Sequence, residues 1–158
     1  MEKKIKDSAA IRMPPPVYFF VCSGAGALLE YLYPVHTVNL PLLARVIVGC
    51  IFMLISGYFA LSAVIALTKN KTPFDPAKPT VRVVTEGSFR FSRNPLYLSL
   101  LLLLFGIAFL TFSLWLFFSI PILFILFLFN AVKPEERYLS QKFGKEYSDY
   151  SAKVRRWI

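Results

Sequence analysis

Long uncharged stretches separated by short polar segments dominate the sequence. The longest runs from Asn94 to Val132, 39 residues without a charge. As a helix with a rise of about 1.5 Å per residue it would be roughly 58 Å long, enough to cross a hydrocarbon layer of about 30 Å twice. Together with two earlier stretches, this hairpin predicts four membrane-spanning helices, at about Val17–Tyr33, Leu43–Leu67, Tyr97–Phe112 and Leu114–Val132.

The pattern supports these spans unequally. The second is the clearest, since residues 46–68 carry no charge and are long enough to cross. The first is short and carries Glu30 near its end, so a helix lying partly in the membrane interface is the alternative. A cleaved signal peptide is a further interpretation of the basic N-terminus, but the proline triplet at 14–16 and the lack of a small-residue cleavage site argue against it.

The composition indicates an integral membrane protein. Hydrophobic residues make up 56% of the chain and charged residues 17%, against about 25% charged in a typical soluble domain. The expected fold is all-α, with one domain over residues 1–158. Within it we expect the first two spans at 1–67, a cytoplasmic loop at 68–96, a helical hairpin at 97–132 and a cytoplasmic C-terminal segment at 133–158.

The basic residues predict the orientation. Of 18, four precede the first span, six lie in the loop before the third and seven follow Val132, so that Arg45 alone lies near the opposite side. The positive-inside rule then places both termini and the central loop in the cytoplasm, in a cell inner membrane or an endomembrane. This topology and attraction to anionic membrane lipids account for the net charge of +9. No nucleic acid partner is expected, because the basic residues flank spans rather than form a domain.

Few residues suggest metal or redox chemistry. Cys22 and Cys50 fall inside predicted spans, where a disulfide is not expected, and no Cys/His spacing is typical of a metal site. His36 lies in the predicted outer loop, away from the basic face. An acid inside a span is by default a site candidate, yet Glu30 lies near the outer edge, where it reaches water. Asn130 lies one helical turn before the C-terminal acids, where it could line a pocket with them.

Two polar clusters flank the uncharged hairpin, whose two passes would bring them to the same membrane face. The first ends a loop that begins with spaced prolines, continues extended at residues 81–84 and turns at 86–88. The aromatic and basic residues at 89–93 are typical of an interfacial linker, which composition alone favours. Pro95 opens the third span at a position where its missing N–H costs little, and the free N–H groups there suit an anionic group.

The second cluster opens a C-terminal helix. Pro134 lies near its start, and Glu135 and Glu136 in the first turn suit the helix dipole. Taken alone, the two acids need no further role. Gly144 permits a bend, and the aromatic residues after it give the tail an amphipathic, interface-seeking character.

Taken together, the two clusters resemble the isoprenylcysteine carboxyl methyltransferase and phospholipid methyltransferase superfamily of integral membrane enzymes. Neither motif is specific alone, but their order, spacing and intervening hairpin match. The resemblance covers about residues 80–156. It is carried by Val84-x-x-Gly87-x-Phe89-Arg90-x-x-Arg93-Asn94-Pro95-x-Tyr97 and, after the hairpin, Glu135-Glu136-x-x-Leu139-x-x-x-Phe143-Gly144-x-x-Tyr147-x-x-Tyr150.

The resemblance implies an enzyme that binds S-adenosylmethionine (SAM) on the cytoplasmic side, between the loop and the C-terminal amphipathic helix. Its acceptor would be a lipid-like molecule entering from the bilayer. Asn94 replaces a histidine of the prenylcysteine enzymes, and Ala131 replaces an arginine implicated in substrate binding, so a carboxylate and an amine acceptor both stay open. The implied cofactor-binding residues are Val81, Arg82, Val83, Val84, Phe89, Arg93, Asn94, Pro95, Leu96, Tyr97, Glu135 and Glu136, with no catalytic residue assigned and no metal.

Two other functions stay open from the sequence. The first is a reductase similar to the sterol reductases, which share the C-terminal membrane architecture and bind NADPH but are usually longer, with more spans. The second is a non-enzymatic lipid-binding or assembly protein that keeps the fold without the chemistry. The oligomeric state is not determined by the sequence.

Overall fold

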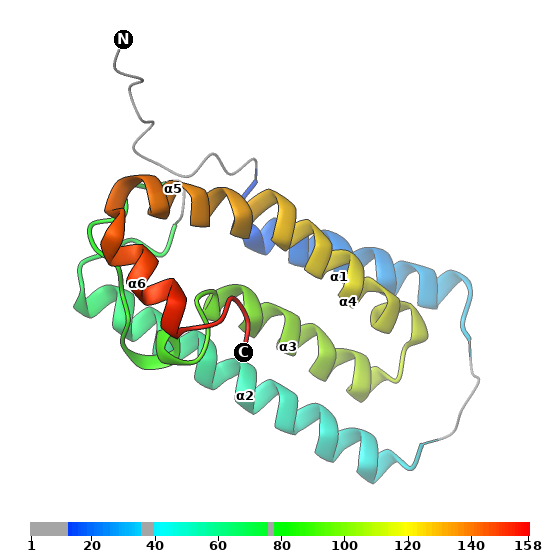
Figure 1. Ribbon diagram of the computed structural model, residues 1–158. Helices are drawn as coiled ribbons and strands as arrows, with labels where there is room; N and C mark the ends of the chain where they lie inside the picture. The colour runs from blue at the N-terminus through cyan, green and yellow to red at the C-terminus, as the bar shows by residue number, and fades with distance from the viewer. Residues whose placement is uncertain (1–12, 36–39, 76–77) are drawn as a thin grey trace.

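The computed structural model describes residues 13–35, 40–75 and 78–158, and these residues form helices and no strand, as the sequence predicts. Figure 1 shows the long helices of the bundle lying side by side, with shorter helices closing one end. The helices are α1 Pro15–Leu32, α2 Leu42–Lys69, α3 Pro95–Thr111, α4 Leu114–Phe127, α5 Lys133–Phe143 and α6 Lys145–Lys153, with a short 3-10 helix η1 at Gly87–Arg90 and a π-helical segment η2 at Leu128–Val132.

Each predicted span coincides with a helix to within a few residues. Two of the described helices are long and apolar enough to cross a membrane: α2, and the continuous helix Leu114–Phe143 that α4, η2 and α5 form together. Helix α3 is apolar but shorter. These helices fit a membrane protein, whereas the count of four spans stays a prediction.

Two helix pairs build the bundle, α2 along α3 and α1 along α4 (Figure 1). Glycines let the first pair approach closely. A Cβ atom on Gly49 of α2 would lie 3.0 Å from the Gly106 carbonyl oxygen and 2.6 Å from the Leu110 side chain. Across the same interface the buried Ser56 hydroxyl donates to the Ser99 carbonyl oxygen at 2.7 Å.

The turn between α3 and α4 accounts for two residues that the sequence singles out. Ser113 caps the start of α4, and its hydroxyl donates to the Glu30 carboxylate at 2.7 Å. Arg45 donates to the Leu110 carbonyl oxygen at 2.8 Å, where a cation complements the negative end of the α3 dipole. Glu30 and Arg45 therefore connect helix ends at the hairpin turn.

The π-helical segment η2 determines which way the C-terminal acids face. The Lys133 N–H bonds to the Leu128 carbonyl oxygen, five residues earlier, so the turn holds one residue more than an α-helical turn. One inserted residue rotates the rest of the helix by about 100°, because a regular helix has 3.6 residues per turn. Ala131 and Val132 are fully buried in the core on this segment, and the acids follow it after Lys133 and Pro134.

Some predictions fall outside the described ranges. They concern His36, the loop proline Pro76 and the basic residues Lys3, Lys4, Lys6 and Arg12. Of the two cysteines, both free thiols, Cys22 is buried between helices and Cys50 is exposed on α2.

Candidate functional site

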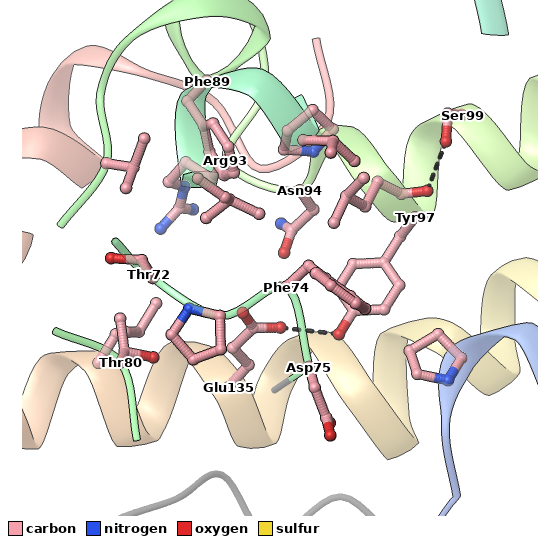
Figure 2. Close-up of a pocket in the computed structure, with 18 of the residues that line it drawn as sticks. Thr72, Phe74, Asp75, Thr80, Phe89, Arg93, Asn94, Tyr97, Ser99 and Glu135 are labelled. Atoms are coloured by element: carbon pink, nitrogen blue, oxygen red, sulfur yellow. Dashed lines mark hydrogen bonds between the residues drawn. The ribbon is translucent and has the colours of Figure 1, made fainter. Parts of the chain in front are cut away.

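A cavity of about 510 Å³ lies at the end of the bundle where α3 begins. It has the size of ordinary small-molecule sites, about 300–1,000 Å³. Its walls come from the start of α1, the last turns of α2, the loop at 72–84, the segment 89–100, and helices α5 and α6. Figure 2 shows side chains converging on it from the loop, from α3 and from the long C-terminal helix.

The structure gathers most of the predicted cofactor residues around this cavity. Val81 is exposed and lies outside the lining, and so does Glu136, whose carboxylate faces Arg93 and Arg156 instead. Asn130 is also outside it, and its side chain donates to the Leu126 carbonyl oxygen at 3.0 Å. The predicted residues that line the cavity are Arg82, Val83, Val84, Phe89, Arg93, Asn94, Pro95, Leu96, Tyr97 and Glu135.

Glu135 and Tyr97 meet in the cavity (Figure 2), where the Tyr97 hydroxyl donates to a Glu135 carboxylate oxygen at 2.8 Å. The Tyr97 ring packs against Phe127, with 5.4 Å between ring centroids. Glu135 lies beyond Val132, the last residue of the uncharged run, and burial raises its pKa to about 7. The hydrogen bond from Tyr97 opposes this rise, and the negative charge of Glu136 adds to it. A cation in the cavity would therefore favour the ionised carboxylate.

Arg93 brings positive charge to another wall (Figure 2). One terminal nitrogen lies 3.4 Å from the Glu136 carboxylate, and the other donates to the Tyr147 hydroxyl at 3.5 Å. Burial raises the pKa of Tyr147 to about 12, so this hydroxyl is neutral at physiological pH. The Arg93 Nε is buried and has no hydrogen-bond partner among the described residues. Such an N–H costs free energy unless a ligand or water accepts from it.

The segment before α3 is held from two sides. Ser88 binds α2, since its N–H donates to the Ser62 hydroxyl at 2.9 Å and its own hydroxyl donates to the Phe59 carbonyl oxygen at 3.1 Å. From the other side, the Tyr150 hydroxyl of α6 donates to the Phe89 carbonyl oxygen at 2.8 Å. These contacts hold Phe89 at the cavity wall.

Gly87 allows this segment to turn against α2. Its φ is +59°, and a Cβ atom there would lie 2.7 Å from the Ser62 hydroxyl oxygen and 3.0 Å from the Ser62 carbonyl oxygen. We expect Gly87→Ala to lower the free energy of unfolding by about 1–3 kcal/mol, because it adds backbone strain and a clash. Thermal unfolding in detergent measures the change. Gly57→Ala, where no atom of the described residues lies within 4 Å of the added Cβ, should unfold at or slightly above the parent temperature. Equal melting temperatures of the two variants would contradict this expectation.

Other cavity residues were not among the predicted cofactor-binding residues. Thr72, Phe74 and Asp75 come from the loop after α2, and Pro15 comes with its neighbours from the start of α1. Tyr147 and Tyr150 also line the cavity, and the motif contains both. The proline spacing of the loop and the two motif tyrosines are the signals that could have indicated these walls.

Comparisons with known proteins agree with this geometry. The sequence model of a family described as "Phospholipid methyltransferase" matches residues 44–146, well over half of the chain. That stretch includes the loop, the segment 93–97 and both acids of α5. A protein of Haemophilus influenzae described as uncharacterized is 46% identical over 68 residues, which is 40% of this chain and all of that protein. No solved structure matches the chain.

Proposed function

The chain belongs to the phospholipid methyltransferase family, and from this premise we propose that it transfers a methyl group from SAM to an amphiphilic acceptor in the membrane. The acceptor is a lipid-like molecule that presents a carboxylate or an amine. The observation that carries the proposal is the cavity, because the Glu135–Tyr97 pair and Arg93 present an acidic and a basic group to one ligand.

The groups around the cavity fit the charges of SAM, which carries an ammonium, a carboxylate and a sulfonium. The Glu135 carboxylate suits the ammonium or the ribose hydroxyls. The Arg93 Nε, which has no partner in the described part of the chain, and the free N–H groups at the start of α3 suit the carboxylate. The aromatic rings of Phe89 and Tyr97 offer faces to a cation.

Positioning supplies most of the catalysis under this proposal. When bound, SAM supplies a methyl group carried by a positively charged sulfur. Methyl transfer requires the acceptor atom in line with that sulfur, so the contribution of the chain is to bind, orient and exclude water. A carboxylate acceptor is already anionic, whereas an amine acceptor must lose its proton before it attacks. Neither reaction needs a covalent intermediate with the protein.

The cavity faces the cytoplasm under this proposal. Basic residues of the central loop and of the C-terminal segment occur at the end of the bundle where the cavity lies, as the positive-inside rule requires. Ala60 and Val64 of α2 and Leu100 of α3 extend the lining along apolar helices. The apolar part of an acceptor would contact this side of the cavity.

Calorimetric titration of S-adenosylhomocysteine (SAH), the demethylated form of SAM, into the detergent-purified protein tests the proposal. We expect micromolar-range binding of SAH and no binding of NADPH. Binding of NADPH alone would indicate a reductase, and binding of neither would leave a non-enzymatic lipid-binding protein. The family match favours neither alternative.

Tyr97→Phe tests the hydrogen bond inside the cavity. The substitution keeps the ring that packs on Phe127 but removes the hydroxyl that donates to Glu135. We expect SAH to bind about three- to tenfold more weakly, the effect of a hydrogen bond worth about 0.5–1.5 kcal/mol. Titration measures the affinity, and Tyr58→Phe, at an exposed tyrosine of α2, is the control. Parent-like binding by Tyr97→Phe would remove the hydroxyl from the site.

A further inference from the structure

The last five residues of the chain run across the start of α3 (Figure 1). The Arg93 N–H donates to the Arg155 carbonyl oxygen at 3.0 Å. The Arg156 carbonyl oxygen accepts from the Asn94 side-chain amide at 2.9 Å and from the Ser92 hydroxyl at 3.2 Å. The tail thus binds three consecutive residues, two of which line the cavity.

The Arg156 guanidinium connects the tail to α5. Its Nε and Nη2 donate to the two carboxylate oxygens of Glu136 at 2.9 and 2.8 Å, a bidentate contact. Arg93 lies 3.4 Å from the same carboxylate. The side chains of Glu136 and Arg93 are only 13% and 15% exposed, so water and salt screen this pair weakly. Glu136 is therefore shared between the tail and the cavity wall.

Trp157 adds an apolar anchor next to this ion pair. Its ring lies 5.0 Å from the Phe124 ring of α4, between centroids, and it packs against the main hydrophobic core. Backbone hydrogen bonds, a bidentate ion pair and a partly buried ring contact thus occur on three consecutive tail residues. If the tail served only to terminate α6, it would need none of these contacts with the residues that form the cavity wall.

We infer that Arg156 is a positioning residue, which holds Glu136 and thereby keeps Arg93 and Asn94 at the cavity wall. This inference refines the proposed function. It rests on that function in the experiment that uses SAH as the probe. It assigns different tasks to the two adjacent acids of α5. Glu135 faces the ligand, and Glu136 orders the wall behind it.

The test compares Arg156→Gln with Arg155→Gln, in SAH titration and in hydrogen exchange of the Arg93 amide. The control loses the same charge one residue earlier, from an exposed side chain, and keeps its backbone carbonyl. We expect Arg156→Gln to weaken SAH binding at least tenfold and to speed exchange at Arg93, and Arg155→Gln to change neither. Arg156→Lys keeps the charge but not the bidentate contact, so its affinity should fall between the two. Melting temperatures show whether a variant has lost stability in general. A general loss of stability would not place the SAH affinities of the three variants in this order.

Parent-like SAH binding and parent-like exchange at Arg93 in Arg156→Gln would overturn the inference. If the parent chain itself does not bind SAH, the proposed function fails, and the exchange rate at Arg93 alone then decides whether Arg156 holds the wall. Should Arg156→Gln not fold, Arg156→Lys with Arg155→Lys as its control makes the same comparison. In that case, equal affinity and equal exchange of the two lysine variants would overturn the inference.

Discussion

Glu135→Gln is expected to weaken the binding of SAH about 10- to 100-fold. The substitution removes the negative charge but keeps an amide oxygen, which can still accept from the Tyr97 hydroxyl that binds Glu135. The packing of the side chain is therefore preserved. The loss is that of a charge-assisted hydrogen bond to the ligand, worth about 1.5–3 kcal/mol. Calorimetric titration at neutral pH measures the change.

Glu146→Gln provides the matched control for this prediction. Glu146 is an exposed acid of α6, so its substitution removes the same charge from the C-terminal segment without touching the cavity lining. We expect Glu146→Gln to bind SAH and to melt like the parent. If Glu135→Gln bound SAH as tightly as Glu146→Gln, Glu135 would not be a ligand and the cofactor site would lie elsewhere.

The helices could be predicted from the sequence because length and charge alone specify them. The uncharged run before Lys133 predicts a hairpin, and α3 and α4 form one with its turn at Ser113. Pro95 begins α3 at the predicted position, because a proline at the first helical residue loses no helical hydrogen bond. Gly144 ends α5 with φ +49°, the left-handed backbone that favours glycine.

The orientation of the two adjacent acids could not be predicted from their spacing. Neighbouring side chains in a helix point about 100° apart, so either acid could face the cavity. The π-helical turn before Lys133 sets the choice, and that turn occurs where Ala131 and Val132 pack into the core. The ion-pair partner of Glu136 could not be predicted from the sequence either. Arg156 lies twenty residues further along and reaches Glu136 only because the chain bends back after α5.

The cavity walls that the loop after α2 forms could not be predicted from the local sequence either. Spaced prolines indicate an extended segment but not the path that it takes. Here the path depends on tertiary contacts such as the hydrogen bond at 3.2 Å from the Thr80 N–H to the Tyr138 hydroxyl of α5. Thr72 and Phe74 line the cavity together with residues of α2 and α5, an arrangement that only the packed bundle defines.

Raising the pH from 5.5 to 7.5 is expected to strengthen SAH binding and, through the same carboxyl group, to weaken the fold. Glu135 has a pKa of about 7 in the folded chain, against an ordinary value of 4.5. An acid with a raised folded pKa contributes stability that is complete below the unfolded pKa and is lost as the pH rises through the folded pKa. The window for this loss is therefore about pH 4.5 to 7.

The affinity for SAH changes with pH in the opposite direction to the stability of the fold. The ammonium of SAH is protonated below about pH 8, and it prefers the ionised carboxylate. The affinity should rise by up to about tenfold per pH unit below the Glu135 pKa and level off above it. Titrations and melting curves of the parent and of Glu135→Gln, at the same pH values, separate this group from every other titrating residue. In Glu135→Gln the rise in affinity with pH should disappear. The melting temperature of this variant, relative to that of the parent, should increase as the pH rises. A parent affinity that stayed constant across this range would mean that the Glu135 carboxylate does not hold the ammonium, even if SAH binds.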